Sequence, residues 1–302
     1  LRDSVLPAVA GLWRAIYLRA TIPRPELVRA WDRLNATASV NVDRYFGRAI
    51  KGLVLVDRAT RGDWQVIDEA VRENSEFPAP RNLGSRLHAI RVRALGELQG
   101  MIAADPRTAA AARDLVPRLD EPAQVIEVEW IVGLSALMRG DSATLGSVLQ
   151  RLAADTGGAA SIARRPLRAI GMGRGGQRAP AAESLLTLER AHTNAPTKIW
   201  GAFAADRLLA AQWLGESRRY ATADSLLRFT EGFVTAGPAE ATISVIPGVY
   251  LERSRLAEGL GDRARAVKFA TLFLRAFDLA PPSQRLLVDE AQARIRRFRN
   301  SP

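Results

Sequence analysis

The residues most suggestive of ligand chemistry form a run rich in glycine and arginine, GMGRGGQRAP, which begins at Gly171. The spacing Gly171-x-Gly173-x-x-Gly176 formally matches the fingerprint of dinucleotide-binding folds, in which a strand precedes the glycines and a helix holds the pyrophosphate. The preceding residues IARRPLRAI lack the pattern of a buried parallel strand, and no acidic residue follows at the required distance. We therefore interpret residues 155–180 as a connecting loop and not as a nucleotide site.

Five arginines surround this run and give it a positive charge. Guanidinium groups pair well with carboxylates and phosphates, and the backbone N–H groups of glycine-rich loops favour bound anions. The loop is therefore a candidate anion site, with the candidate residues Arg164, Arg165, Arg168, Arg174 and Arg178.

Histidines and carboxylates give little sign of a catalytic or metal centre. The chain has two histidines, His88 and His192, and neither has a second ligand three or four residues away, as a zinc site requires. Cysteine is absent, which excludes thiolate ligands and cysteine nucleophiles. Glu127 and Glu129 fall on different faces of a helix, so they do not suggest an acid–base pair. We expect a protein that is not an enzyme and that holds no metal and no cofactor.

The chain carries a strong positive charge, with 43 basic and 32 acidic residues and a formal net charge of +11. Such a charge favours nucleic acid, anionic lipid or an acidic protein as a partner. The arginines are spread along the chain, however, as a GC-rich genome also produces, and aromatic residues are not interleaved with them as a stacking platform requires. Binding of nucleic acid or another polyanion is therefore our alternative function.

The elements that would position these residues are predicted to be helices. In the stretch RARAVKFATLFLRA, apolar residues recur at helical spacing, with Val267, Ala270 and Leu274 on one face. Residues 248–262, which follow Pro247, have a similar pattern. No stretch shows the sustained alternation of a strand. A composition of 47% hydrophobic residues, dominated by Ala, Leu and Arg, agrees with a globular all-α fold.

Short turns separate the predicted helices at nearly regular intervals. The motif RGD occurs at residues 61–63 and again at 139–141, and in both places the glycine can end one helix while the aspartate caps the next. We therefore interpret both motifs as helix turns and not as adhesion loops. The predicted turns lie at intervals of 42, 36, 36, 39 and 46 residues, at Gly62, Ala104, Gly140, Gly176, Gly215 and Gly261.

These turns and the residues around them resemble the tetratricopeptide-repeat family, most clearly over residues 200–298. In LERSRLAEGLGDRARAVKFATLFL, Ser254 is the small residue in the middle of the first helix, and Ala266 follows the Asp of the turn by four residues. Gly133 and Gly140 repeat the first two of these features in an earlier unit.

The resemblance implies a right-handed α-solenoid of about six antiparallel helix hairpins. Leu145 stands where the earlier unit should have its alanine, so the first half of the chain is a degenerate match. We expect a single helical-repeat domain over residues 1–302, with a subdivision into degenerate repeats over 1–160 and clearer repeats over 178–302.

The resemblance also places the first helix of each hairpin along a concave groove that binds a partner. Carried over through the Gly-Asp turns, it assigns eight residues to this groove: Glu127, Trp130, Leu134, Leu209, Gln212, Leu251, Arg255 and Glu258. The set is largely apolar and lacks the basic clamp that some family members use for peptide carboxylates. The expected partner is therefore another protein, bound through an apolar or amphipathic helix or peptide.

The leading functional prediction is a non-catalytic scaffold for protein–protein interaction. Similar helical regions follow the kinase domain of some bacterial serine/threonine kinases or belong to bacterial regulators, so the resemblance implies part of a larger signalling or assembly protein. No stretch is long and apolar enough to span a membrane, and we expect a soluble domain on the cytoplasmic or periplasmic side of the cell. The chain begins at Leu1, which leaves room for a leader or another domain before it.

Overall fold

The described part of the chain consists of helices and the turns between them, with no strand, which confirms the prediction of an all-α protein. The computed structural model describes residues 29, 56–73, 83–155, 157–192, 203–231, 239–280 and 282–299. Nearly all of the first 55 residues, which the sequence assigns to degenerate repeats, lie outside this description.

The helices follow one another with short connections. The α-helices are α4 (Gln65–Glu73), α5 (Leu83–Leu98), α6 (Pro106–Arg113), α7 (Pro122–Arg139), α8 (Ser142–Ala154), α9 (Gly158–Arg174), α10 (Arg178–His192), α11 (Phe203–Glu216), α12 (Tyr220–Leu226), α13 (Ala239–Gly259), α14 (Arg263–Ala276) and α15 (Arg285–Arg299). Short 3-10 helices are η2 (Val116–Arg118), η3 (Arg228–Glu231) and η4 (Pro282–Gln284). Consecutive helices pack in pairs: α5 with α6, α7 with α8, α9 with α10, α11 with α12, and α13 with α14.

Residues with a left-handed backbone mark the turns between paired helices. In the described residues, positive φ angles occur at separations of 38, 40, 36, 42 and 43 residues, at Gly62, Gly100, Gly140, Gly176, Arg218 and Gly261. Four of these positions are turns predicted from the sequence. The turn predicted at Ala104 has its left-handed residue four positions earlier, and the turn predicted at Gly215 comes three positions later, because Gly215 lies inside α11.

In two of the three Gly-Asp turns the aspartate caps the helix that follows, whereas Asp63 of the first turn pairs with Arg58. Asp141 accepts a hydrogen bond from the backbone N–H of Thr144 at 3.0 Å, and Asp262 accepts one from the backbone N–H of Arg265 at 3.0 Å. Such a cap satisfies an N–H group that has no partner within its own helix. Both RGD motifs lie at helix turns, as predicted, with left-handed glycines at Gly62 and Gly140, but the predicted aspartate cap is found only in the second motif.

The prediction of a loop over residues 155–180 is wrong. Residues Gly158–Arg174 form α9, which passes through Pro166, and only residues 175–177 connect it to α10. The low helix propensity of the glycines in the last turns of α9 is overcome by packing, because the ring of Trp213 occupies the space beside Gly173.

Helix α13 also differs from the sequence prediction, because it begins at Ala239 and continues through Pro247. Proline removes a helical hydrogen bond and normally favours a helix end. Packing on both sides of this turn supports the helix: a Cβ at Gly248 would lie 2.9 Å from the side chain of Leu208 on α11 and 2.9 Å from that of Gln99 at the end of α5.

The two ends of the described chain pack against each other. One cluster of buried apolar side chains includes Trp64 beside α4 and Phe273 of α14. The backbone oxygen of Arg61 accepts a hydrogen bond from the N–H of Leu279 at 2.7 Å, and the Arg61 guanidinium binds Asp278 at 2.7 Å. The first turn is therefore fixed by residues more than 200 positions later.

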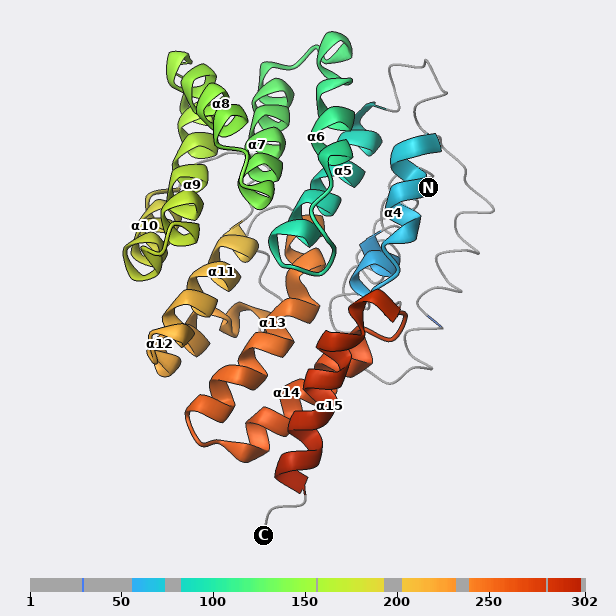
Figure 1. Ribbon diagram of the computed structural model, residues 1–302, viewed down its shortest axis with the longest axis vertical. Coiled ribbons are helices and arrows are strands. Elements are labelled where there is room, and N and C mark those ends of the chain that lie inside the picture. Colours follow the sequence, from blue (N-terminus) through green and yellow to red (C-terminus); the bar gives the residue numbers. More distant parts are fainter. Residues whose placement is uncertain are drawn as a thin grey trace.

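Figure 1 shows how the chain returns on itself: α5–α10 occupy the upper part of the view, and α11–α15 lie below them. Helix α13 packs on both α11 and α5. In an open solenoid each hairpin contacts only its neighbours along the chain, so the contact between α5 and α13 departs from that pattern. The right-handed solenoid of about six hairpins therefore stays a prediction.

Candidate functional site

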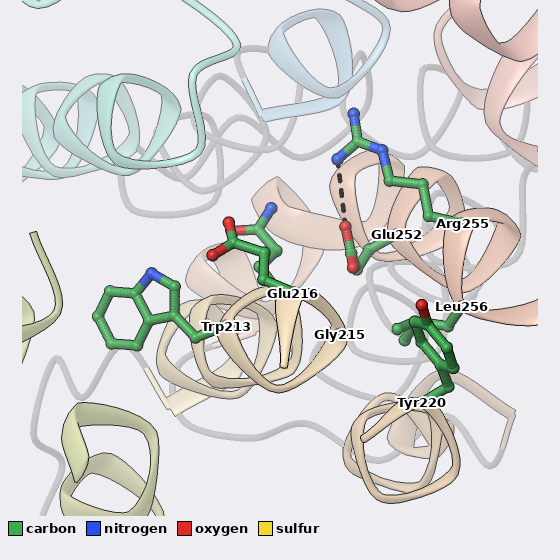
Figure 2. A pocket seen from close by; sticks show the side chains of 8 residues that line it. Trp213, Gly215, Glu216, Tyr220, Glu252, Arg255 and Leu256 are labelled. Carbon is green, nitrogen blue, oxygen red and sulfur yellow. Dashed lines mark hydrogen bonds and ion pairs between the residues drawn. The ribbon is translucent and has the colours of Figure 1, made fainter. Parts of the chain in front are cut away.

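A pocket of about 450 Å³ opens between α11, α12 and α13, which belong to two successive helix pairs. Its lining residues are Gln212, Trp213, Gly215, Glu216, Tyr220, Glu252, Arg255 and Leu256. Figure 2 shows these side chains around the pocket, with an ion pair between Glu252 and Arg255. The lining combines apolar and aromatic groups with carboxylates, an amide and a phenol, which suits a ligand that has both an apolar and a polar part.

Glycines on neighbouring helices position the apolar wall of the pocket. A Cβ at Gly215 of α11 would lie 2.8 Å from the side chain of Leu256, and a Cβ at Gly259 of α13 would lie 2.6 Å from the ring of Tyr220. Because these two positions carry no side chain, α11 and α12 approach α13 closely. Tyr220 and Leu256 both line the pocket, on the same side of it in the view of Figure 2.

Trp213 joins the pocket to the preceding helix pair. Its ring fills the space that a side chain at Gly173 of α9 would need, and it is buried. In Figure 2 the ring points away from Glu252 and Arg255. Trp213 therefore acts mainly as a packing anchor for the wall and offers little surface to a ligand.

Glu252 is the buried carboxylate of the pocket, with 4% of its surface exposed. Its Oε2 accepts a hydrogen bond from Nη1 of Arg255 at 3.1 Å. Burial disfavours the charged form and raises the pKa of Glu252, while the charge of Arg255 partly offsets this effect. Arg255 also donates two hydrogen bonds to Glu290 of α15, at 2.8 and 2.7 Å, so one guanidinium serves two carboxylates.

The ion pairs continue along α13 and α15. Arg294 donates to Glu258 at 2.6 Å and to Glu290 at 3.2 Å, and Arg297 also pairs with Glu258. The hydrogen bonds from Arg255 lower the pKa of Glu290. We call this set the α13–α15 ladder; its members are Glu252, Arg255, Glu258, Glu290, Arg294 and Arg297. The ladder fixes the α13 side of the pocket against the last helix.

The rim of the pocket carries a second carboxylate, Glu216, whose side chain is 47% exposed. Its Oε2 pairs with Arg178, the first residue of α10. The hydroxyl of half-buried Tyr220 has no hydrogen-bond partner within the described part of the chain. The rim therefore offers further polar groups to a ligand above the apolar wall.

The structure brings two of the eight predicted groove residues, Gln212 and Arg255, to this pocket. Leu209 and Glu258 are half-buried, and Glu258 is held in the ladder. The other four are at most 4% exposed, so the prediction that they line an open groove is wrong: Glu127, Trp130, Leu134 and Leu251. They are covered because α7 packs on α5, α6, α8 and α9, while α13 packs on α5, α11, α12 and α14.

Glu127 is a structural ion-pair partner instead of a groove residue. Its Oε1 accepts a hydrogen bond from Nε of Arg91 at 2.5 Å. Burial raises the pKa of Glu127, and Arg91 partly offsets that rise. The ion pair joins α7 to α5, which are the first helices of two successive helix pairs.

The five predicted anion-site arginines do not surround a loop, because four lie in α9 and Arg178 begins α10. Arg174 donates to the sulfur of Met138 at 3.2 Å, and Arg178 is held by Glu216. The remaining three lie in the middle of α9, where Arg164 is half-buried and Arg165 and Arg168 are exposed. The predicted anion site is therefore reduced to the exposed face of α9 that carries Arg165 and Arg168.

The predicted absence of metal and membrane features can be compared with the described residues only. Among them, no group of three His, Asp or Glu side chains could hold a metal ion. None of their helices has the length and hydropathy of a membrane span. The Nε2 of His88 is buried, and burial lowers the pKa of His88 to about 3. The side chain of His192 lies outside the described residues.

The other lining residues, above all Glu252, Tyr220 and Leu256, were not predicted from the sequence. The signal that marks them is a glycine inside a helix together with a large side chain about 40 residues away, as for Gly215 with Leu256 and Gly259 with Tyr220. Taking Gly215 as a turn residue concealed this relation.

The chain matches no family model, no curated protein and no solved structure.

Proposed function

We propose that this chain is a tetratricopeptide-like helical-repeat scaffold that binds another protein without catalysing a reaction. The observation that carries the proposal is the open pocket between two successive helix pairs, lined by both apolar and charged side chains. Binding surfaces of helical-repeat proteins are built in this way, by neighbouring repeats together. A larger bacterial signalling or assembly protein, with this domain in the cytoplasm or periplasm, is the context that we propose.

Two regularities support the repeat character. Seven positions before the left-handed residue, four turns have a small residue, namely Gly133, Ala169, Ala211 and Ser254. Five ion pairs join residues 35 to 38 positions apart: Arg91–Glu127, Arg178–Glu216, Arg219–Glu183, Arg255–Glu290 and Arg294–Glu258. A spacing of one repeat is expected when equivalent helices of successive hairpins lie side by side.

Site-specific photo-crosslinking tests the proposal. A photoreactive amino acid replaces Gln212 at the pocket, and the same residue replaces Leu286, which is 82% exposed on α15, as the matched control. We expect crosslinks to one protein from Gln212 and not from Leu286. The captured protein is then purified and its affinity for the full chain measured by calorimetry.

Two results would count against the scaffold. One is an equal crosslinking pattern at both positions, which indicates non-specific contact. The other is a captured protein that shows no saturable binding once purified, at concentrations where micromolar affinity is detectable.

Polyanion binding is the second candidate, and the outer face of α9 favours it. Arg165 and Arg168 are exposed one turn apart, and neither has a carboxylate partner within the described residues. Binding of a labelled duplex oligonucleotide across a salt series tests this function. The logarithm of the affinity should fall with the logarithm of salt concentration, by about 0.9 for each phosphate contacted, and a flat response would exclude it.

A further inference from the structure

We propose that the pocket between α11, α12 and α13 receives a basic side chain, lysine or arginine, from the protein partner. The aliphatic part of that side chain would lie on Leu256 and Tyr220, with its charged end at Glu252. This inference rests on the proposed scaffold function and adds the chemical class of the group that is bound.

The principal observation is the unequal use of the two oxygens of Glu252. Oε2 is bound by Arg255, whereas Oε1 has no hydrogen-bond donor within the described part of the chain. Oε1 lies beside α11, 3.4 Å from where a Cβ on Gly215 would stand. Oε1 is open to the pocket and not sealed in the core, so a ligand that brings hydrogen-bond donors can reach this oxygen and form charge-assisted hydrogen bonds with it.

The pocket has no corresponding group for an anion. Three nitrogens of Arg255 already donate: Nε and Nη2 to Glu290, and Nη1 to Glu252. The remaining lining charge is the rim carboxylate Glu216, of which one oxygen is used by Arg178. An incoming anion would meet two carboxylates and no free guanidinium, whereas a cation would be attracted by both acids.

The apolar wall favours a long side chain over a small cation. Leu256 and the Tyr220 ring both line the pocket, on the side of it away from Arg255 in the view of Figure 2. Lysine and arginine place aliphatic stems along such surfaces, and an aromatic ring also attracts a cationic head. The volume of about 450 Å³ leaves ample room for one such side chain.

Small probes bound to the full chain test the inference. The probes are Nα-acetyl-lysine amide and Nα-acetyl-arginine amide, with Nα-acetyl-norleucine amide and Nα-acetyl-glutamate amide as neutral and acidic controls. Binding is followed by chemical-shift changes of the backbone amides of α11–α13. We expect the basic probes to bind at least about tenfold more tightly than the neutral or acidic ones.

Three variants locate the binding site. Glu252→Gln should weaken the basic probes about tenfold or more, and a melting curve shows whether the variant is folded. Gln212→Lys, at a half-exposed position, places a competing ammonium in the pocket and should give the same loss without removing a buried group. The matched control is Glu129→Gln, which removes a carboxylate of α7 from its pair with Arg151 and should leave probe binding unchanged.

The results separate this inference from the scaffold proposal. Equal binding of the lysine and norleucine probes, tighter binding of the glutamate probe, or no binding by any probe would overturn the basic-side-chain assignment, even if a partner is captured through position 212. Basic probes that bind and are lost in both pocket variants support the assignment, even if the crosslinking experiment captures nothing. Weaker binding of the basic probes by the Glu129→Gln control would also overturn the assignment.

Discussion

Two surfaces of this molecule use arginine in opposite ways. Along the α13–α15 ladder, Arg255, Arg294 and Arg297 each bind a glutamate on the opposite helix. On the outer face of α9, Arg165 and Arg168 have no carboxylate partner among the described residues. The same residue type therefore joins helices in one region and presents free charge in another.

This contrast shows that position in the fold, and not composition, decides what an arginine does. In the ladder a glutamate lies 35, 36 or 39 residues from the arginine that binds it, so each of these pairs joins α13 to α15. The net charge of +11 does not reveal this division. If the comparison is correct, substitutions should be costly where an arginine is paired and nearly neutral where it is not.

The largest effect should come from Arg253, the most deeply paired arginine, which is 1% exposed. Its Nε donates to Asp224 at 2.9 Å, and its guanidinium lies 4.1 Å from the centre of the Phe269 ring. Arg253→Met leaves the buried Asp224 with less compensation, so we expect a loss of about 3 kcal/mol in the free energy of unfolding. Urea denaturation followed by circular dichroism measures it.

Arg165→Met is the matched control for this substitution. It makes the same chemical change on the exposed face of α9, and we expect a change within about 0.5 kcal/mol. Similar losses in the two variants would show that pairing does not distinguish the two regions.

Two glycines provide a second comparison between a helix contact and an exposed surface. Gly259→Ala would bring a Cβ to 2.6 Å from the Tyr220 ring, so overpacking should destabilise the fold by about 2 kcal/mol. Gly146 in α8 has nothing within 4 Å of the corresponding position, and Gly146→Ala should stabilise the helix by up to about 1 kcal/mol. Thermal unfolding of both variants shows whether each substitution raises or lowers the stability. Destabilisation by both would contradict the assigned contacts.

The turns and the helical class were predictable from the sequence because they depend on local chemistry. Gly140 with Asp141, and Gly261 with Asp262, combine a left-handed helix end with an N-cap, and both signals lie within a few residues. The prediction of turns failed at Gly215, where the glycine serves a contact with a residue far along the chain. Local sequence cannot distinguish these two uses of glycine.

The candidate site was much less predictable, because burial depends on which helices cover which. Leu134 and Arg255 hold corresponding places in the assumed repeat, six residues before Gly140 and Gly261, yet Leu134 is buried and Arg255 reaches the pocket. The contact of α13 with α5 that covers one side of the chain joins residues about 150 positions apart. No local pattern contains such a contact, so the groove assignment failed where the chain returns on itself.

A smaller effect is expected in the ladder itself, at Glu290. Hydrogen bonds from Arg255 lower its pKa in the folded protein, so its contribution to stability is present above the ordinary carboxyl pKa of 4.5 and is lost as the pH falls through the folded value. Because the side chain is 32% exposed, Glu290→Gln should cost only about 1 kcal/mol at pH 7. The difference from the parent protein should shrink below about pH 4. A difference that stays constant from pH 7 to pH 3 would show that the charge of Glu290 is not responsible.

The smallest effect on stability is expected on α9. In Arg165→Gln with Arg168→Gln, two like charges one turn apart are removed and no ion pair is lost, so stability should change by less than about 0.5 kcal/mol. Oligonucleotide binding is the sensitive measurement here: if this face contacts phosphates, the double variant should lower the salt slope by up to about 1.8. The matched pair Arg294→Gln with Arg297→Gln should destabilise the protein measurably, because both arginines hold Glu258. If the α9 variant were the less stable of the two, the division between paired and free arginines would have to be abandoned.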